Sequence, residues 1–403
     1  MNNKNITVLL TENIHKQAEI VLKELDFKIK RLNKAPSEKE LVTNLKQVNV
    51  LCSRSRTHIN KNVLLKSNLN CIGVFCIGVS QVDLKTACEK GVPVFNAPYG
   101  NTRSVAEMVI GLLVALSRSL FDHSQNLHKG IWSKSAEGCF ELRGKTLGII
   151  GYGNIGSQVS VLAEAFGMKT LYYDIVSKLP IGNAKPSFNL KNLLKNSDFV
   201  TLHVPDTPQT KKLIRKKEIS WMKKGAYLIN TSRGTVVDIL ALKQALKTKY
   251  LAGAAMDVFP IEPKSNQEEF RSPLQNMEST ILTPHVGGST EEAQLSIVFE
   301  VCKSLKRFLK TGSIQNSVNF PDLLVPAIEP KVTRVINIHK NQPGVLTEIN
   351  KLVSRSGVNI NSQYLATNEK VGYLIMDLEK KNVQKLAEKM SKLEVSIKTR
   401  VIV

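Results

Sequence analysis

The stretch GKTLGIIGYGNIGSQVSVLAEAFGMKTLYYD, residues 144–174, decides the fold of the region around it. It runs through a short apolar segment, a G-x-G-x-x-G turn, a helical pattern and a second apolar segment that ends in an acid. This order is typical of a βαβ unit that binds a dinucleotide. Gly151 suits the tight turn, Gly153 has no side chain to block a pyrophosphate, and Gly156 lets the helix press against the sheet.

The acid at the end of this stretch predicts which dinucleotide binds. Asp174 lies 18 residues after Gly156, near the spacing of about 20 at which a carboxylate accepts hydrogen bonds from the adenosine ribose hydroxyls. We therefore expect NAD rather than NADP as the cofactor, with its phosphates facing the N–H groups of the helix that follows the turn.

Length and composition set the class of protein. A chain of 403 residues with 42% hydrophobic and 22% charged residues is typical of a globular protein with two or three domains. No apolar run approaches the ~18 residues of a membrane span, and the N-terminus lacks the apolar segment of a secretory signal. The six cysteines form no C-x-x-C pair. These features predict a cytoplasmic protein with reduced thiols, no membrane partner and no metal site.

The net charge of +22 raises the question of a nucleic-acid partner. The lysines are spread along the chain rather than clustered with aromatic residues, and no nucleic-acid-binding motif accompanies them. We therefore expect no nucleic-acid partner, and a positive field that attracts small anionic substrates.

The pattern of apolar runs predicts two doubly wound Rossmann-like domains. In the first, β-type runs alternate with polar helical stretches at 6–10, 49–55, 71–76 and 92–97. A long helix with Ser104 as N-cap and Glu107 three residues on leads into the second, where six strands include those at 171–174, 198–205, 226–232, 252–258 and 280–284. An amphipathic helix over 291–310 then returns to the first domain. The expected domains are a discontinuous substrate-binding domain (1–100 and 288–329) and an NAD-binding domain (101–287).

The C-terminal part of the chain has a different order of elements. After a linker with Pro321, Pro326 and Pro330, the patterns predict strands over 333–339, 358–367, 371–379 and 395–403 and helices over 346–357 and 382–393. This βαββαβ order indicates a third, ferredoxin-like domain over 330–403.

Three motifs that follow late strands of the second domain carry candidate catalytic groups: TSRGTVVD at 231–238, DVFPIEP at 257–263 and LTPHVGGST at 282–290. Open α/β sheets bind ligands at the C-terminal ends of their strands. Oxidation of a 2-hydroxy acid needs a base for the hydroxyl proton, a group that tunes the base and a cation for the carboxylate. His285, Glu262 and Arg233 supply these groups.

These motifs, together with VPVFNAPYGNTRSVAEMVIG, GYGNIG and NQPGVL, resemble the D-isomer-specific 2-hydroxyacid dehydrogenase family over nearly the whole chain. The resemblance implies that Arg233, Glu262 and His285 are catalytic. It further implies NAD-dependent oxidation of 3-phospho-D-glycerate to 3-phosphohydroxypyruvate, the first step of the phosphorylated route to L-serine, and admits reduction of 2-oxoglutarate to 2-hydroxyglutarate as a side activity.

The resemblance also assigns further ligand contacts. It places Asn154 and Ile155 at the pyrophosphate and Thr231, Ser232 and Asp257 at the nicotinamide half, and it adds Pro205, Gly287 and Gly288 to the cofactor site. The substrate residues that it implies are Arg54, with its neighbours Ser55 and Arg56, together with Gly78, Asn101 and Arg233. In the glycine-rich loop CIGVSQVD, Val79-Ser80 replaces the family's commoner Thr-Asn, so the role of Gly78 there depends on backbone contacts.

The C-terminal segment resembles an ACT domain, the small module that binds amino acids between paired copies. The resemblance implies that His339, Asn341 and Asn359 hold L-serine as an inhibitor, and that the chain forms a homo-oligomer, a tetramer or dimer, with Lys134 near a subunit contact. Two alternatives remain open: a dehydrogenase for another D-2-hydroxy acid, and a non-catalytic nucleotide-sensing binding protein.

Overall fold

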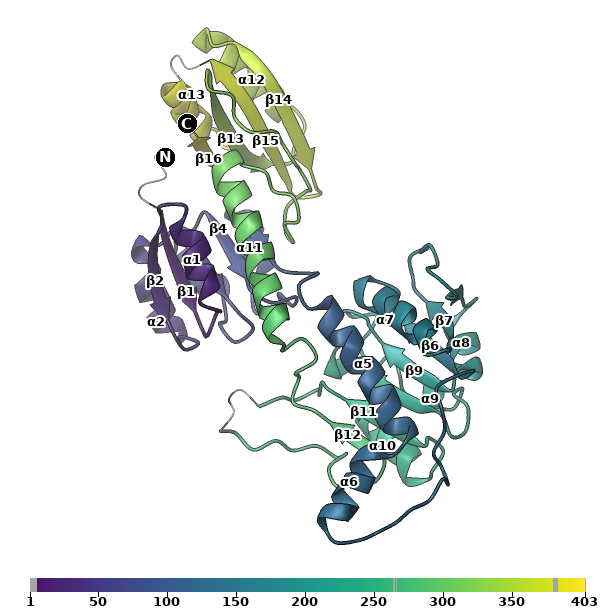
Figure 1. Cartoon of the computed structure of the whole chain (residues 1–403). Coiled ribbons are helices and arrows are strands. Elements are labelled where there is room, and N and C mark those ends of the chain that lie inside the picture. Colours follow the sequence, from purple (N-terminus) through teal and green to yellow (C-terminus); the bar gives the residue numbers. More distant parts are fainter. Residues whose placement is uncertain (1–5, 264, 266, 380–382, 403) are drawn as a thin grey trace. The chain divides into compact units, whose positions relative to one another are not determined.

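The computed structural model describes residues 6–263, 265, 267–379 and 383–402 (Figure 1). The chain divides into two compact units, Met1–Gly100 with Gln294–Val403, and Asn101–Ala293. Both contain parallel sheets with flanking helices, which confirms the predicted α/β class. Among the described residues no single helix is long and apolar enough to cross a membrane. Helices α5 (Thr102–Ser117) and α6 (Leu120–His128) are so only when taken together, and this pair is bent by 65°.

The first unit begins with a five-stranded parallel sheet in the order β2-β1-β3-β4-β5. Its strands are β1 (Thr7–Thr11), β2 (Lys28–Leu32), β3 (Val50–Ser53), β4 (Cys71–Val74) and β5 (Val94–Phe95). Its helices are α1 (Gln17–Lys23), α2 (Glu38–Asn44), η2 (Leu45–Gln47), α3 (Lys61–Leu65) and α4 (Leu84–Glu89). The sequence patterns missed β2, because its KIKRL sequence is highly charged. It lies at the sheet edge, where charged side chains reach solvent.

The second unit contains a seven-stranded sheet in the order β12-β11-β10-β9-β6-β7-β8. Its strands are β6 (Thr146–Ile150), β7 (Lys169–Tyr173), β8 (Lys185–Pro186), β9 (Phe199–Leu202), β10 (Tyr227–Asn230), β11 (Gly253–Met256) and β12 (Thr280–Leu282). All six predicted strands are present. The seventh, β8, has two residues, too few to leave an alternating pattern.

Helices cover both faces of this sheet, which makes it doubly wound. One core packs Leu147 and Ile149 of β6 against α5 (Thr102–Ser117) and α7 (Asn154–Ala165). The other core packs Ile150 and Leu228 against helices of the opposite face. The remaining helices are α6 (Leu120–His128), α8 (Leu190–Asn196), α9 (Lys216–Ile219), η3 (Gly234–Val236) and α10 (Ile239–Lys247).

The predicted start of α5 at Ser104 is wrong. The N-cap is Asn101, three residues earlier, so that the helix begins at Thr102, and the Ser104 hydroxyl lies 2.8 Å from that of Thr290. The hydroxyl of a serine near a helix start can bond groups other than the helix N–H groups, and here the contact with Thr290 takes the place of a capping hydrogen bond.

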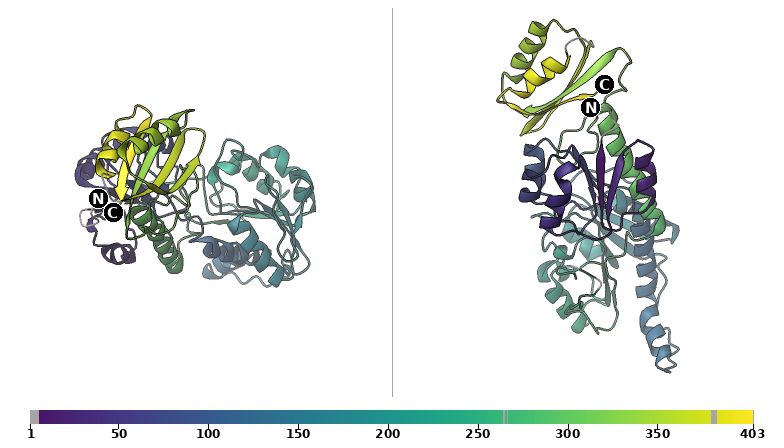
Figure 2. Two further views of the ribbon diagram at one scale, coloured as in Figure 1. Left: turned by 90° about the horizontal axis from the view of Figure 1, so that it is seen from above. Right: turned by 90° about the vertical axis from the view of Figure 1, so that its left-hand side faces the viewer.

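The C-terminal segment has the predicted βαββαβ order and folds into one antiparallel sheet, β14-β15-β13-β16. Its elements are β13 (Val332–Lys340), α12 (Val345–Ser356), β14 (Ile360–Thr367), β15 (Val371–Glu379), α13 (Val383–Ser391) and β16 (Ser396–Ile402). The predicted ends of its last helix and strand, residues 382 and 403, lie outside the described residues. Helices α12 and α13 cover one face of the sheet (Figure 2).

The other face of this sheet packs within the first unit. Ile336 and Ile375 share a core with Phe308 of α11 (Glu291–Thr311) and with Phe95 of β5. The buried Arg334 guanidinium forms two hydrogen bonds with the Asp377 carboxylate, at 2.6 and 2.7 Å, and donates to the backbone oxygens of Thr311 and Pro326. These bonds join the sheet to the end of α11 and to the proline-bearing linker, so the C-terminal segment is packed and hydrogen-bonded to the rest of the first unit.

Candidate active site

The glycine turn between β6 and α7 has the geometry that the fingerprint requires. Gly151 lies at φ +90°, and a Cβ there would collide with the carbonyl oxygen of His203. A Cβ on Gly156 would collide with the carbonyl oxygen of Gly151. Gly153 precedes the helix, and a Cβ built on it meets no atom within 4 Å. The turn therefore leaves open space beside the N-terminus of α7, where Asn154 and Ile155 are the first helical residues.

Asp174 follows β7 and lies beside this turn. Its carboxylate accepts hydrogen bonds from the backbone N–H groups of Tyr152, at 2.8 Å, and Val176, at 2.9 Å. These bonds hold the carboxylate next to the glycine turn, and each of its oxygens keeps lone pairs for further donors.

The other predicted cofactor residues lie on loops after neighbouring strands of the same sheet. Pro205 follows β9, Thr231 and Ser232 follow β10, Asp257 follows β11, and Gly287 and Gly288 follow β12. Two buried polar atoms at these strand ends, Thr231 Oγ1 and His203 Nδ1, have no hydrogen-bond partner among the residues that the structure describes. The open space at Gly153 and these two atoms fit a bound dinucleotide, since buried polar atoms usually have a partner.

The three predicted catalytic residues meet at the same edge of the sheet. His285 Nδ1 lies 2.9 Å from Glu262 Oε2, and Glu262 Oε1 accepts the Phe259 N–H at 3.0 Å. The Arg233 guanidinium donates to the Ser232 carbonyl oxygen at 2.7 Å and is close enough to act electrostatically on both His285 and Glu262. Half of the His285 side chain is exposed. Since Glu262 engages Nδ1, the other ring nitrogen, Nε2, remains for a ligand.

The Glu262–His285 pair shifts both pKa values in the directions that acid–base chemistry needs. The hydrogen bond that Glu262 accepts from Nδ1 raises the pKa of His285 above its ordinary value, against the effects of burial and of Arg233. Partial burial works to raise the pKa of Glu262, but the bonds from His285 and from the Phe259 N–H outweigh it, so that this pKa is lowered. Glu262 is therefore held in its ionised form beside a histidine whose pKa it raises, so the pair favours protonation of the imidazole.

Asp257 holds the loop that carries His285. This residue is 1% exposed, and its carboxylate accepts the Thr283 hydroxyl at 2.6 Å and the N–H groups of Val286 and Gly287, each at 2.9 Å. His285 lies between these anchors at φ +56°, a conformation rare for a residue with a side chain. The sequence interpretation gave Asp257 a cofactor contact and missed this role, which depends on three loop bonds that no motif reveals.

The predicted substrate residues fall in both units. Arg54, Ser55 and Gly78 lie in the first unit, on the loops after β3 and β4. The Gln81 side-chain amide donates to the Arg54 carbonyl oxygen at 2.7 Å and so links these two loops. Asn101 lies in the second unit with Arg233, and in the described part of the chain its buried Oδ1 atom has no hydrogen-bond partner.

The three residues predicted to bind L-serine lie in the C-terminal sheet and its loops. His339 is 3% exposed, with Nδ1 3.1 Å from Asn337 Oδ1, and burial lowers its pKa. Asn341 is exposed, and its amide donates to the Asn368 carbonyl oxygen at 2.8 Å. Asn359 is exposed at the start of β14. The structure thus offers two accessible amides and one buried imidazole.

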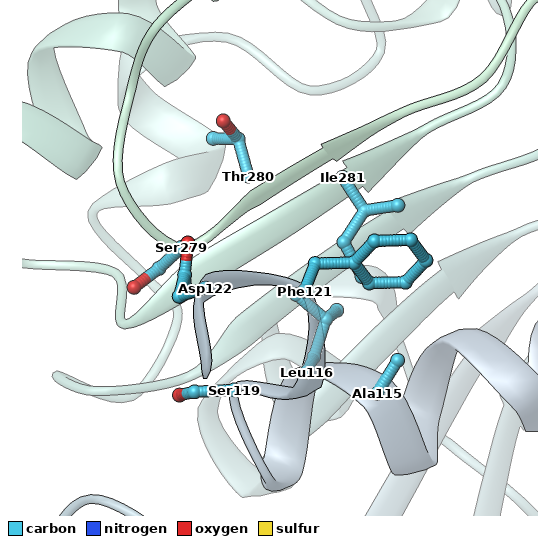
Figure 3. A pocket seen from close by; sticks show the side chains of 8 residues that line it. All are labelled: Ala115, Leu116, Ser119, Phe121, Asp122, Ser279, Thr280 and Ile281. Carbon is cyan, nitrogen blue, oxygen red and sulfur yellow. The ribbon is translucent and has the colours of Figure 1, made fainter. Parts of the chain in front are cut away.

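A hollow, shown in Figure 3, lies near the start of β12, whereas the loop that carries His285 follows the end of that strand. It lies where α5 meets α6, beside the start of β12, and Leu116, Phe121 and Ile281 are among its lining residues. None of the predicted catalytic or cofactor residues lines it.

Comparison with known proteins agrees with this geometry. The family model for the D-isomer specific 2-hydroxyacid dehydrogenase, NAD binding domain, matches residues 110–287, and that for an AHAS small subunit-like ACT domain matches residues 336–398. A D-3-phosphoglycerate dehydrogenase from Dictyostelium discoideum is 48% identical over 398 residues, covering 98% of this chain and 97% of the relative. One from Escherichia coli K12 is 48% identical over 376 residues, covering 93% and 91%.

Solved structures show the same likeness. A D-lactate dehydrogenase from Aquifex aeolicus, complexed with NAD and lactic acid, has 31% sequence identity and a TM-score of 0.65, over 75% of this chain and 95% of that one. The chain belongs to the D-isomer-specific 2-hydroxyacid dehydrogenases, a family of NAD-dependent oxidoreductases, and carries a C-terminal ACT domain. The predicted family, fold class and cofactor are confirmed.

Proposed function

We propose that this protein oxidises 3-phospho-D-glycerate to 3-phosphohydroxypyruvate with NAD, as the first step of the phosphorylated route to L-serine. The observation that carries the proposal is the His285–Glu262 pair, with Arg233 near it, at the C-terminal ends of the strands of the second unit's sheet. The names of the full-length relatives, D-3-phosphoglycerate dehydrogenases at 48% identity, support the choice of substrate.

Each catalytic group has a defined task in this proposal. NAD, when bound, would supply the acceptor for the hydride that leaves the substrate carbon. His285 Nε2 accepts the hydroxyl proton, and the resulting imidazolium is stabilised by Glu262 through Nδ1. The Arg233 guanidinium binds the substrate carboxylate with parallel N–H donors. In the reverse direction the imidazolium returns its proton to the developing alkoxide.

We assign the remaining ligand contacts as follows. Residues 101–287 bind NAD, with Asp174 at the adenosine ribose. Residues 1–100 and 288–329 form the substrate domain, in which Arg54 binds the substrate phosphate. The same arginine would bind the distal carboxylate of 2-oxoglutarate, which supports the reduction of 2-oxoglutarate to 2-hydroxyglutarate as a side activity.

A single assay tests the proposal. Purified protein should reduce NAD with 3-phosphoglycerate and, more readily, oxidise NADH with 3-phosphohydroxypyruvate. Absence of both activities in folded protein would refute it. Turnover of other D-2-hydroxy acids at equal or higher kcat/KM would favour the first alternative, and NAD binding without turnover of any such acid would favour a nucleotide-sensing protein.

The ACT domain supports a regulatory role, in which L-serine binds near His339, Asn341 and Asn359 and inhibits a cytoplasmic homo-oligomer, a tetramer or dimer. Serine must bind one state of the assembly better than another, because equal affinity shifts no equilibrium. Calorimetry with L-serine, and light scattering for the mass in solution, test these two parts of the proposal separately.

A further inference from the structure

A buried acid, Glu12, lies directly after β1 in the first unit. It is 7% exposed and has φ +60°, a conformation that residues with long side chains rarely adopt. Glutamate is seldom buried unless its charge has partners, so the donors around it show what it holds.

Among the described residues, four donors to this carboxylate come from the loop after β3. Oε1 accepts the Arg54 N–H at 2.9 Å, the Thr57 N–H at 3.0 Å and the Thr57 hydroxyl at 2.8 Å. Oε2 accepts the Arg56 N–H at 3.2 Å. The loop therefore surrounds a single side chain, which follows the neighbouring strand β1.

The same region also holds the Arg54 side chain and the next loop. Arg54 Nη1 donates to the carbonyl oxygen of Asn13, the residue after Glu12, at 3.3 Å. The Arg54 carbonyl oxygen accepts the Gln81 amide at 2.7 Å, which joins the Gly78 loop to this arrangement. Hydrogen bonds thus join Arg54 both to the segment that carries Glu12 and to the Gly78 loop.

We infer that Glu12 is a positioning residue that sets the preference of this protein for a phosphorylated substrate, by holding the 54–57 loop in the conformation that presents Arg54 to the phosphate. The inference rests on the proposed function and deepens it. Glu12 has no contact with the ligand in this scheme. It acts through the backbone of the loop, in the way that supporting hydrogen bonds fix a binding group.

The test compares two substrates that differ in the phosphate alone, 3-phosphohydroxypyruvate and hydroxypyruvate, each reduced with NADH. Glu12→Gln keeps the size of the side chain but replaces one acceptor oxygen with an N–H donor, which must face a donor of the loop. We expect KM for the phosphorylated substrate to rise about tenfold or more, from the loss of charge-assisted bonds. KM for hydroxypyruvate, KM for NADH and kcat with the phosphorylated substrate should stay unchanged.

Two further variants keep the result interpretable. Thr57→Val removes the hydroxyl donor from a fully buried site at nearly constant volume, so it should raise the same KM by a smaller factor. Glu19→Gln removes an equal charge from α1, where Glu19 pairs with Lys23 at the surface, and should change neither KM. Thermal unfolding of all variants is measured alongside.

The outcomes separate the inference from the proposed function. If wild-type protein reduces neither substrate, the proposed function fails. If wild type is active but the Glu12 and Thr57 variants keep their preference for the phosphorylated substrate, the positioning role is overturned. The same holds if KM rises equally for both substrates. Lowered thermal stability with unchanged KM values would make Glu12 a purely structural residue.

Discussion

Two histidines in different regions of this molecule face opposite surroundings. His285 lies on a loop after β12, half exposed, with a carboxylate on Nδ1 that raises its pKa. His339 lies in β13, almost fully buried beside the neutral Asn337 amide, and burial lowers its pKa. The partner of Nδ1 and the access of water therefore decide whether the pKa of an imidazole is raised or lowered. The raised pKa of His285 favours the imidazolium that forms when it takes up a proton, whereas the lowered pKa of His339 favours a neutral ring that offers hydrogen bonds alone.

Replacement of each imidazole should give the largest difference in turnover between the two sites. His285→Ala should lower kcat by on the order of 100-fold or more, the usual contribution of a general acid–base group. His339→Gln, assayed without serine, should retain full turnover. Steady-state kinetics of NADH oxidation would measure both, and equal losses in the two variants would contradict the assignment.

The carboxylate partner is the next test. Glu262→Gln should lower turnover by about tenfold at neutral pH and shift the pH profile. Reduction requires the imidazolium, so its rate falls as the pH rises through the His285 pKa. Loss of the carboxylate lowers that pKa, and the fall should therefore move toward acid. In oxidation, which requires neutral imidazole, the rise of the rate should move toward acid as well.

A pH profile measured in both directions distinguishes this effect from simple loss of structure. An unchanged midpoint in Glu262→Gln would show that the 2.9 Å contact with His285 does not tune the base.

Asp174 extends the same reasoning to a carboxylate that selects a ligand. Asp174→Ala should raise KM for NAD severalfold, up to about tenfold, and relax discrimination against NADP, because the ribose loses an acceptor and the 2′-phosphate loses a repelling charge. The ratio of kcat/KM for the two cofactors is the measurement. Equal use of both by the wild-type protein would show that Asp174 does not select NAD.

The smallest expected effect concerns regulation. Asn341→Ala should raise the serine concentration for half-maximal inhibition by a few fold, the loss expected for one exposed hydrogen bond, while turnover without serine is kept. This point variant is a cleaner test than deletion of residues 330–403. Deletion would uncover the core around Phe308, which the C-terminal sheet covers through Ile336 and Ile375. Absence of serine binding to wild type would leave the ACT domain with a structural role.

The sequence by itself was sufficient where function depends on local backbone geometry or on a fixed order of elements. Gly151 and Gly156 could be recognised because a side chain at either position would collide with a carbonyl oxygen. The six longer strands of the second sheet, and the βαββαβ order, could be predicted because alternation and helical periodicity are local properties of the chain. The candidate residues Arg233, Glu262 and His285 were found because their motifs follow strands of one parallel sheet, whose ends meet at one edge.

The tertiary structure alone decided the features that depend on residues far apart in the chain. Glu12 meets its partners more than 40 positions later, and Asp257 meets the His285 loop almost 30 positions later, so neither leaves a local pattern. The charged strand β2 is a strand because β1 pairs with it, against the weak signal of its own side chains. The depth of His339 likewise comes from sheet packing. Burial, and with it the direction of a pKa shift, is a property of the assembled core rather than of the residue.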